Sequence, residues 1–329
     1  MTRVAAVDCG TNTIRLLIAD LIRDGAGRAH LEPLRRRNEI VRLGQGVDRT
    51  GVLDPAALER TLAVVEDYAA DCAEFDVEPG ERNRRFVATS ATRDARNRED
   101  FVAGVRRLLG VAPEVVSGQE EARLSFTGSL LGAHESSDGG AVPRLVVDLG
   151  GGSTELVLGV DAPAAAISLD IGSVRLTERY LVDGVTPAAE KAARVEVREL
   201  LDRAARTVDL AATGRLVGLA GTITTVTAHA LGLAEFDPEA IDGAELSVED
   251  AVASCDAIVH STAAERESWG YLRPGRRDVI AAGALVWSEV VARVVAETTA
   301  AGRPLGVVVT SLHDILDGIA LSLARGSGR

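Results

Sequence analysis

The chain has 329 residues, enough for two domains of ordinary size, and 46% of them are hydrophobic. Its formal net charge of −13 and its aromatic content of 3% argue against a general nucleic-acid or membrane-surface binder, because such surfaces need positive charge or stacking rings. The three cysteines (Cys9, Cys72 and Cys255) are widely spaced and form no disulfide framework or zinc pattern. We therefore expect a reducing, cytoplasmic location with no membrane segment.

The first predicted element is a hairpin with a polar tip. An apolar run ends in Asp8, the turn Cys-Gly10-Thr11-Asn12-Thr13 follows, and a second apolar run leads to Ala19. Glycine lets backbone N–H groups approach an anion, and the neighbouring hydroxyl and amide groups add hydrogen bonds. The pattern predicts a phosphate-binding turn, although an ordinary turn with a solvated acid has the same appearance.

The rest of the first half alternates strands and helices. We expect a strand at residues 38–43, preceded by an arginine run at 35–37 that suits a solvated strand edge. Asp54 and Pro55 are typical of a helix start. A strand at 85–91, a helix at 98–109, a short strand at 113–118 and a helix at 119–131 follow. The polar, glycine-rich residues 132–143 form the expected domain boundary.

The second half repeats this order. Its hairpin spans 145–160 around Asp148-Leu-Gly150-Gly151-Gly152-Ser153-Thr-Glu155, the clearest phosphate-binding pattern in the chain. A strand at 165–169, a helix at 188–210 and a strand at 215–220 ending in Gly221-Thr222 follow. Helices at 248–264 and 277–297, a strand at 305–310 and a helix at 312–324 complete the chain.

This repetition predicts a duplicated α/β fold. We place an N-terminal domain at residues 1–133 and a C-terminal domain at 134–329, with the last helix, 312–324, packing back on the first domain. Ligands of such sheets bind beyond the carboxyl ends of the strands. We therefore expect the loops at these ends to form one site in a central cleft.

Phosphoanhydride hydrolysis needs positioned phosphates, neutralised charge and a proton acceptor for water. The acids Asp148 and Glu155 are badly placed for a bare anion, but they suit a divalent cation between carboxylate and phosphate. Glu121 is the candidate proton acceptor. It also stands at a helix start, where an acid is stabilised by the helix dipole, so a simple capping role is the alternative.

Two further positions have the chemistry of phosphate ligands. Arg93 follows the strand at 85–91, and arginine binds phosphate through two hydrogen bonds, but a surface ion pair with Asp94 or Glu99 is the alternative. Gly221 and Thr222 open a helix whose N-terminus can bind an anion, or they simply begin that helix.

Taken together, these motifs resemble those of the exopolyphosphatase/guanosine pentaphosphate phosphohydrolase (Ppx/GppA) family. The resemblance covers most of the chain and lies in five segments in the family's order: residues 7–13, 89–93, 117–123 (Ser-Gly-Gln-Glu-Glu-Ala-Arg), 147–155 and 218–222. It implies the actin-like (ribonuclease H-like) ATPase-superfamily fold and a Mg²⁺-dependent phosphohydrolase that releases orthophosphate from the end of inorganic polyphosphate.

The resemblance also implies roles for single residues. It makes Glu121 the general base and Glu155 an acid that orients water or metal, and it places Asp148 and Asp8 at the metal. The phosphate-binding residues that it implies are Gly10, Thr11, Asn12, Arg93, Gly150, Gly151, Gly152, Ser153, Gly221 and Thr222.

The resemblance leaves alternatives open. Guanosine pentaphosphate ends in the same kind of anhydride, and a sugar kinase or a non-catalytic phosphate or nucleotide sensor could use the same fold. The chain has the length of short family members that lack a C-terminal helical domain, and Leu316 replaces an arginine that relatives often have. Family analogy further suggests a homodimer, whereas the composition and charge argue against a nucleic-acid partner.

Overall fold

The computed structural model describes residues 2–25, 29–132 and 142–324. Its contacts divide the chain into two units, one of Met1–Leu131 with His313–Arg329 and one of Gly132–Leu312. Most of the segment in which we expected the domain boundary lies outside the described residues. The end of the chain is grouped with the first unit, and each unit is described below by itself.

The first unit is built on a five-stranded sheet in the order β3-β2-β1-β4-β5. Its first three strands pair antiparallel, whereas β4 and β5 join in parallel. The strands are β1 (Thr2–Cys9), β2 (Thr13–Arg23), β3 (Ala29–Ile40), β4 (Arg84–Ala88) and β5 (Glu114–Val115).

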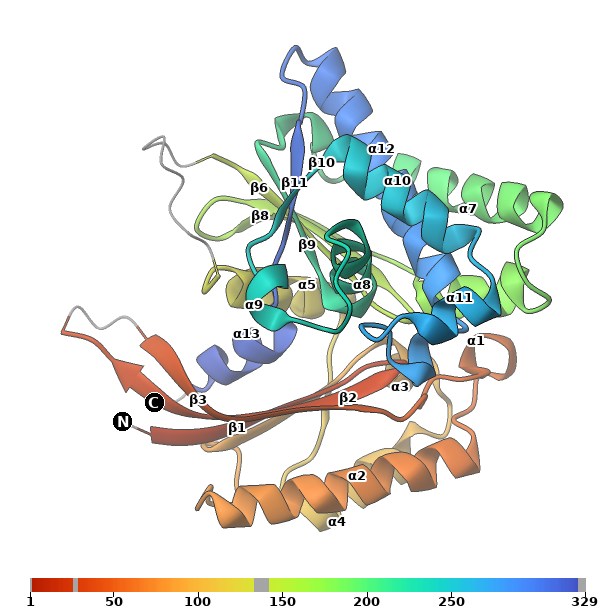
Figure 1. The fold of residues 1–329 in the computed structure, drawn as a ribbon. Coiled ribbons are helices and arrows are strands. Elements are labelled where there is room, and N and C mark those ends of the chain that lie inside the picture. The colour runs from red at the N-terminus through yellow and green to blue at the C-terminus, as the bar shows by residue number, and fades with distance from the viewer. Residues whose placement is uncertain (1, 26–28, 133–141, 325–329) are drawn as a thin grey trace. The chain divides into compact units, whose positions relative to one another are not determined.

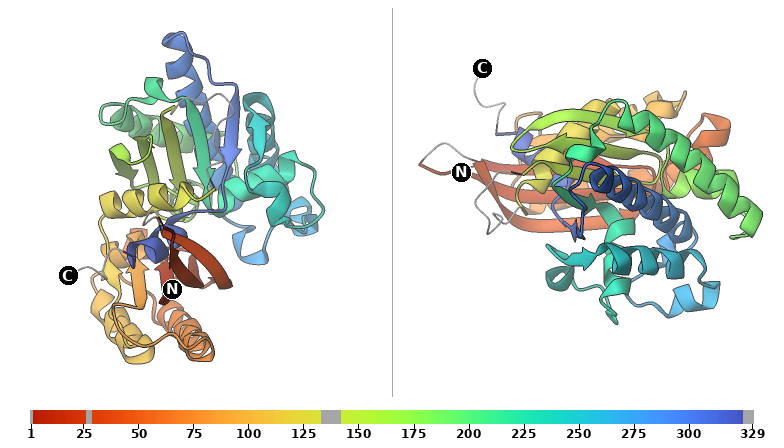
Figure 2. Two further views of the ribbon diagram at one scale, coloured as in Figure 1. Left: turned by 90° about the vertical axis from the view of Figure 1, so that its left-hand side faces the viewer. Right: turned by 90° about the horizontal axis from the view of Figure 1, so that it is seen from above.

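Alternating side chains give this sheet two buried faces. Val7 and Ile14 belong to an apolar cluster with α2 (Pro55–Glu74) and α4 (Arg98–Leu109), which lie together on one face (Figures 1 and 2). Ala6 and Leu17 belong to a second cluster with α5 (Gly118–Ser129) and α13 (Ile315–Ser322) on the other face. Two short helices, α1 (Val47–Thr50) and α3 (Ser90–Asp94), lie in the connecting loops.

Local sequence signals explain most boundaries in this unit. Asp54 caps α2 by accepting from the N–H groups of Ala56 and Ala57 at 2.9 and 3.1 Å, which confirms the predicted helix start. The predicted bounds of α4 are also confirmed. The strand expected at 38–43 was misplaced, because β3 begins at Ala29 and includes the arginine run.

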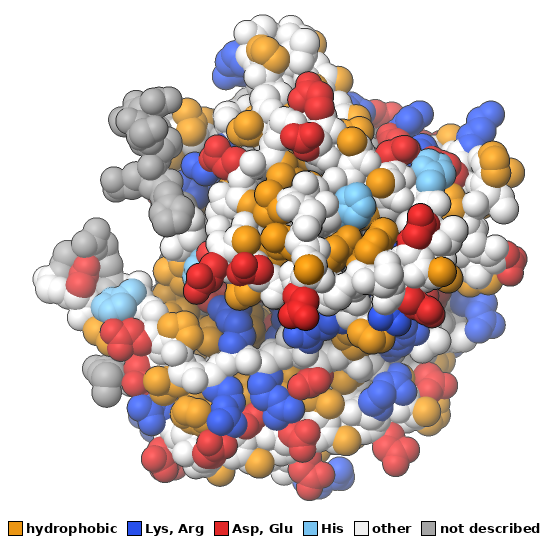
Figure 3. All heavy atoms as spheres, viewed as in Figure 1, with side chains coloured by type: hydrophobic (Ala, Val, Ile, Leu, Met, Phe, Trp, Pro, Cys, Tyr) orange, Lys and Arg blue, Asp and Glu red, His pale blue; other side chains and the backbone are white. Residues whose placement is uncertain are grey.

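The arginine run lies on β3, an edge strand of the sheet, as expected. Acidic side chains neutralise it: Arg35 and Arg37 pair with Asp71 on α2, and Arg36 pairs with Asp317 on α13. Acidic and basic side chains are interspersed over the face shown in Figure 3. No helix among the described residues has both the length and the apolar character needed to cross a bilayer.

The second unit contains a six-stranded sheet in the order β10-β11-β9-β6-β7-β8. Apart from the added edge strand β10, it repeats the order and strand directions of the first sheet. The predicted duplication is therefore confirmed. The strands are β6 (Arg144–Leu149), β7 (Thr154–Gly159), β8 (Pro163–Leu169), β9 (Arg215–Leu219), β10 (Glu245–Ser247) and β11 (Val307–Thr310).

One large apolar cluster joins this sheet to its helices, with Trp287 among the largest fully buried side chains. The principal helices are α7 (Pro187–Ala205), α8 (Ala220–Ala230), α10 (Val248–Val259) and α12 (Ile280–Ala300). The long α12 lies beside α10 and α7 (Figure 1). Shorter elements are α6 (Ser173–Leu176), a π-helical turn (Thr177–Leu181), α9 (Pro238–Ile241) and α11 (Ala263–Ser268).

Several boundaries in this half differ from the prediction. The single helix expected at 248–264 is two helices, because Thr262 begins α11 with a capping box that includes Glu265. The last helix begins at Ile315 rather than 312, because Asp314 caps it. The strand β10 and the short helix α6 were not predicted.

Close backbone packing of α5 against α13 generates a stability prediction. A Cβ at Gly128 would lie 1.7 Å from the Asp314 carbonyl oxygen, and one at Gly318 would lie 2.0 Å from the Leu124 carbonyl oxygen. We expect Gly128→Ala to lower the free energy of unfolding by about 2 kcal/mol, because forcing the two helices apart outweighs the gain in helix propensity.

Urea unfolding followed by circular dichroism measures this change. Gly25→Ala is the control, since a Cβ there meets nothing within 4 Å. Equal stability of the Gly128→Ala and Gly25→Ala variants would contradict the packing argument.

Candidate active site

In the first unit, the ends of three strands bring the predicted residues together. The end of β1 is paired with that of β4 through Cys9 and Ala88, and β4 is paired with β5 through Ala88 and Val115. The turn after β1, the helix α3 after β4 and the start of α5 after β5 therefore leave the same edge of the sheet, as the sequence predicts.

The turn at Gly10–Thr13 is held on two sides. Gly10 N–H donates to the Thr13 carbonyl at 2.9 Å, and the Thr11 hydroxyl is 2.9 Å from that of Ser90 on α3. The carbonyl oxygens of Thr11 and Asn12 accept from N–H groups of the loop after β3. In a trans peptide the N–H points opposite to the carbonyl, so the amides of Asn12 and Thr13 face away from that loop.

Glu121 is buried in the first turn of α5, with only 7% of its surface exposed. The Arg93 guanidinium donates to its Oε2 at 3.2 Å and to the Val116 carbonyl oxygen at 2.9 Å. Two residues singled out separately in the sequence thus form one ion pair. A carboxylate held in this orientation is a candidate proton acceptor.

Glu120, the neighbouring acid, has a different environment. Its carboxylate forms two hydrogen bonds with Arg123, at 2.7 and 2.6 Å, and this arginine lowers the pKa of Glu120. The Ser117 hydroxyl caps the helix by accepting from Glu120 N–H at 3.3 Å. Of the two glutamates, Glu121 is therefore the buried one, and Glu120 is part of a partly exposed ion pair.

Asp8 lies at the end of β1 and is 4% exposed. Arg15 is its direct cross-strand neighbour on β2 and donates to Asp8 Oδ2 from Nε at 3.0 Å and from Nη2 at 2.7 Å. Burial raises the pKa of Asp8, and the charge and hydrogen bonds of Arg15 oppose that rise. The positive charge beside Asp8 is thus the Arg15 side chain, which the sequence analysis did not anticipate.

In the second unit, the acids at the end of the hairpin face each other. Asp148 on β6 and Glu155 on β7 are directly paired across the antiparallel ladder and are 7% and 1% exposed. Glu155 Oε1 accepts from the Ser168 hydroxyl at 2.7 Å. The position that is Arg15 in the first hairpin is therefore an acid in the second, since both lie seven residues after the strand-end aspartate.

The carbonyl oxygens of the glycine turn in this hairpin accept hydrogen bonds from the start of α6. Ser173 N–H donates to the Gly150 oxygen, Val174 and Arg175 N–H groups donate to the Gly151 oxygen, and Arg175 Nε donates to the Gly152 oxygen. The N–H groups of residues 151–153 consequently point away from α6. Adjacent N–H groups that point the same way form an anion-binding concavity.

Equivalent glycines allow this arrangement in both units. A Cβ at Gly44 would lie 2.4 Å from the Thr11 side chain, and one at Gly172 would lie 2.6 Å from the Gly151 backbone. Each glycine follows the third strand of its unit and lets that segment approach the turn closely enough to bind its carbonyls.

Gly221 and Thr222 lie beside the glycine turn. Asp148 is paired with Leu219 at the end of β9, and α8 starts at the next residue, Ala220, whose φ of 72° is left-handed. The Arg276 guanidinium packs against Gly221, where a Cβ would lie 1.9 Å from its Nη1 atom. The structure brings a basic side chain to this helix start that the sequence did not point to.

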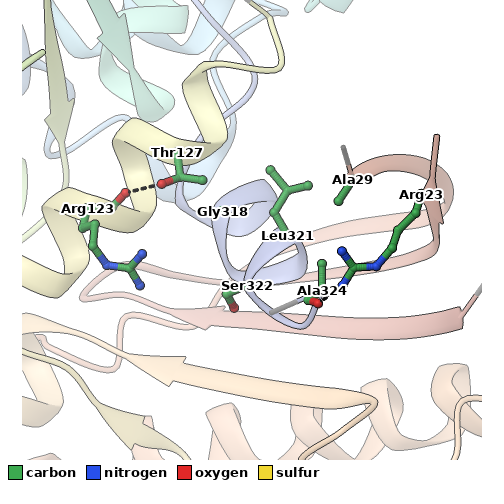
Figure 4. Close-up of a pocket in the computed structure, with 8 residues that line it drawn as sticks. All are labelled: Arg23, Ala29, Arg123, Thr127, Gly318, Leu321, Ser322 and Ala324. Carbon is green, nitrogen blue, oxygen red and sulfur yellow. Dashed lines mark hydrogen bonds between the residues drawn. The ribbon is translucent and has the colours of Figure 1, made fainter. Parts of the chain in front are cut away.

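Leu316, noted as a departure from relatives, is fully buried among apolar side chains of the first unit. A cavity of about 260 Å³ also lies in this unit, lined by residues that include Arg23, Arg123 and Leu321 (Figure 4). None of the predicted site residues lines it. Arg23 ends β2, about 33 Å from Thr13 at the usual strand rise, so this cavity is separate from the turn.

Comparison with known proteins assigns the chain to a family. The model of the Ppx/GppA phosphatase family matches residues 21–300. The chain belongs to the Ppx/GppA phosphatase family. It is 46% identical to exopolyphosphatase 2 of Mycobacterium tuberculosis over 330 residues, which are 98% of this chain and 99% of that protein.

Solved structures of the family agree. A protein described as exopolyphosphatase-like is 44% identical, with a TM-score of 0.90 over 99% of this chain and 100% of that one. The Aquifex aeolicus member of the Ppx/GppA family is 27% identical, with a TM-score of 0.75 over 100% of this chain and 99% of that one. The predicted family and the predicted duplicated α/β fold are both confirmed.

The facing acids of the second hairpin generate a second prediction. Like charges directly opposite each other in a sheet destabilise it, and here both are buried. We expect Asp148→Asn to raise the free energy of unfolding by about 1 kcal/mol in buffer that contains a chelator, because the repulsion between two directly opposed carboxylates is removed.

Thermal unfolding in a chelator measures the effect. Asp161→Asn serves as control, because Asp161 is an exposed acid in the same unit. An Asp148→Asn variant less stable than the wild type would show that the acid is stabilising where it stands.

Proposed function

We propose that this protein is an exopolyphosphatase that hydrolyses the terminal phosphoanhydride bond of inorganic polyphosphate and releases orthophosphate. The substrate is inferred from the end-to-end similarity to exopolyphosphatase 2. The structural observation that carries the chemistry is the buried Glu121 carboxylate held by Arg93, because it places a candidate proton acceptor at the sheet edge from which the first phosphate turn also leaves.

In the proposed reaction, Glu121 takes a proton from water as the water oxygen bonds to the terminal phosphorus. The bridging P–O bond breaks at the same phosphorus, which releases orthophosphate and leaves a chain one phosphate shorter. The amides of Asn12 and Thr13, and those of residues 151–153, bind phosphate oxygens. We also assign phosphate contacts to Gly10, Thr11, Gly150, Gly221 and Thr222, and Arg93 adds positive charge.

The carboxylates fit Mg²⁺ in the second hairpin better than in the first. Mg²⁺ is usually bound through one or two carboxylates plus substrate phosphates and water. The described residues contain no cluster of three or more acidic, histidine or cysteine side chains arranged for a metal, but Asp148 and Glu155 form a facing buried pair. We propose that they hold the ion, which when bound neutralises phosphate charge.

Asp8 was expected at the metal as well. Its carboxylate already accepts two hydrogen bonds from Arg15, the residue opposite it on β2. The residue opposite Asp148 is instead another acid, Glu155. The role of Asp8 as a ligand stays a prediction that the Mg²⁺ dependence of variants tests. The three buried, unbridged cysteines suit the cytoplasmic location that we propose for the protein.

Glu121→Gln tests the proposed base. We expect kcat for phosphate release from polyphosphate to fall by about 10²–10⁴-fold, because the amide accepts no proton, while KM changes little. Glu120→Gln is the matched control one residue away, and its turnover should stay near that of the wild type. The assay measures orthophosphate from short and long polyphosphate and from guanosine pentaphosphate.

Full turnover by Glu121→Gln would leave this residue only a helix-capping role. Release from guanosine pentaphosphate alone would change the assigned substrate. Binding of polyphosphate without release, under Mg²⁺, would make the protein a sensor rather than an enzyme.

Asp148→Asn tests the metal assignment. We expect about a tenfold higher Mg²⁺ concentration for half-maximal turnover, because one anionic ligand is lost. Asp8→Asn provides the comparison: an equal shift would make Asp8 a ligand too, whereas an unshifted titration would restrict the metal to the second hairpin. An unchanged titration in Asp148→Asn would remove Asp148 from the metal site.

A further inference from the structure

We propose that Asp314, at the start of the C-terminal helix α13, is a positioning residue for the first half of the site. Through Arg15 it fixes the Asp8 carboxylate and the phosphate turn that follows Asp8. The inference rests on the proposed function only where turnover is concerned. It is carried by contacts within the first unit.

The first step is the position of Arg15 between two carboxylates. Its Nε and Nη2 atoms donate to Asp8 Oδ2, and its Nη1 atom donates to Asp314 Oδ2. Asp8 and Asp314 are 4% and 5% exposed, and the Arg15 side chain is 16% exposed. Charge-assisted hydrogen bonds in such a shielded place hold their geometry much more firmly than they would in water.

The second step is that the Asp314 carboxylate is itself held in place. Its Oδ1 atom accepts from Leu316 N–H at 3.0 Å, and Asp317 completes the capping box by accepting from Asp314 N–H at 3.1 Å. One carboxylate oxygen therefore caps α13 and the other binds Arg15. A side chain bound at both oxygens cannot rotate without breaking one of these contacts.

The third step is that α13 is fixed against the helix that carries Glu121. Gly128 of α5 lies against the Asp314 backbone, and Gly318 of α13 lies against the Leu124 backbone. A continuous set of rigid contacts thus runs from α5 through α13 and Arg15 to Asp8. These contacts fix the position of the first phosphate turn relative to α5, the helix that carries the proposed general base.

The comparison of the two hairpins supports a specific role for this contact. Glu155 occupies in the second hairpin the register position that Arg15 has in the first. The first hairpin has a guanidinium at this position, which an additional acid can hold in a fixed orientation. The second hairpin has none there. Without Asp314, the Arg15 guanidinium would lose its Nη1 contact to the start of α13, and the hairpin end would gain freedom.

The experiment compares Asp314→Asn, Arg15→Gln and the double variant. The asparagine keeps an oxygen that can cap α13 but removes the charge on Arg15, and Asp314→Ser is a second variant that keeps a cap. Asp317→Asn is the matched control, because it alters the same capping box yet pairs with Arg36 rather than Arg15. Hydrogen exchange of residues 9–13 and phosphate release from polyphosphate are measured for each.

We expect Asp314→Asn to speed amide exchange at residues 9–13 about tenfold and to lower kcat about tenfold with KM nearly unchanged. Asp317→Asn should do neither at comparable thermal stability. The double variant should equal Arg15→Gln, because Asp314 acts through Arg15.

Unchanged exchange at residues 9–13 in Asp314→Asn, or an effect of equal size in Asp317→Asn, would overturn the proposal. Additive losses in the double variant would show that Asp314 acts by another route, and would overturn it as well. A wild-type protein that releases no phosphate would refute the proposed function instead, and the exchange data would still decide the role of Asp314.

Discussion

In each unit, the central strand ends in a buried carboxylate, Asp8 or Asp148, whose charge has to be neutralised. A buried charge is costly unless another group compensates it. In the first unit Arg15 compensates Asp8 from the neighbouring strand. In the second unit the neighbouring strand instead presents Glu155 to Asp148. The duplicated hairpins therefore differ in charge at one register position: the first pairs an acid with an arginine, and the second pairs two acids.

The two phosphate turns follow from a second shared device. In each unit, the segment after the third strand donates hydrogen bonds to the carbonyls of the turn, so that the opposite amides are directed together. Gly44 and Gly172 make this possible, since a side chain at either position would separate the segments. The glycines inside the turns therefore do not explain this arrangement alone. Gly44 and Gly172, which approach the turns from the neighbouring segments, are equally necessary.

The motifs alone were enough to indicate the family, the duplication and the hairpins, because glycine turns after apolar strands have few other uses. They also singled out Glu121 and Arg93, but as separate residues with separate alternatives. Their ion pair required the ends of β4 and β5 to be adjacent, which is a property of strand order. The starting point of β3 was missed because the arginines were expected to precede the strand, whereas ion pairs with α2 and α13 neutralise them within it.

Hydrophobic period and glycine content are local properties, so the amino-acid sequence was enough to predict which residue types stand at the strand ends. It did not determine which charges face each other. Arg15 became the partner of Asp8 through antiparallel register, and Asp314 joined them although 299 residues separate it from Arg15. Only the tertiary structure brings the end of the chain to its first hairpin. The physical reason is that an ion pair depends on distance in space, and packing rather than sequence order decides that distance.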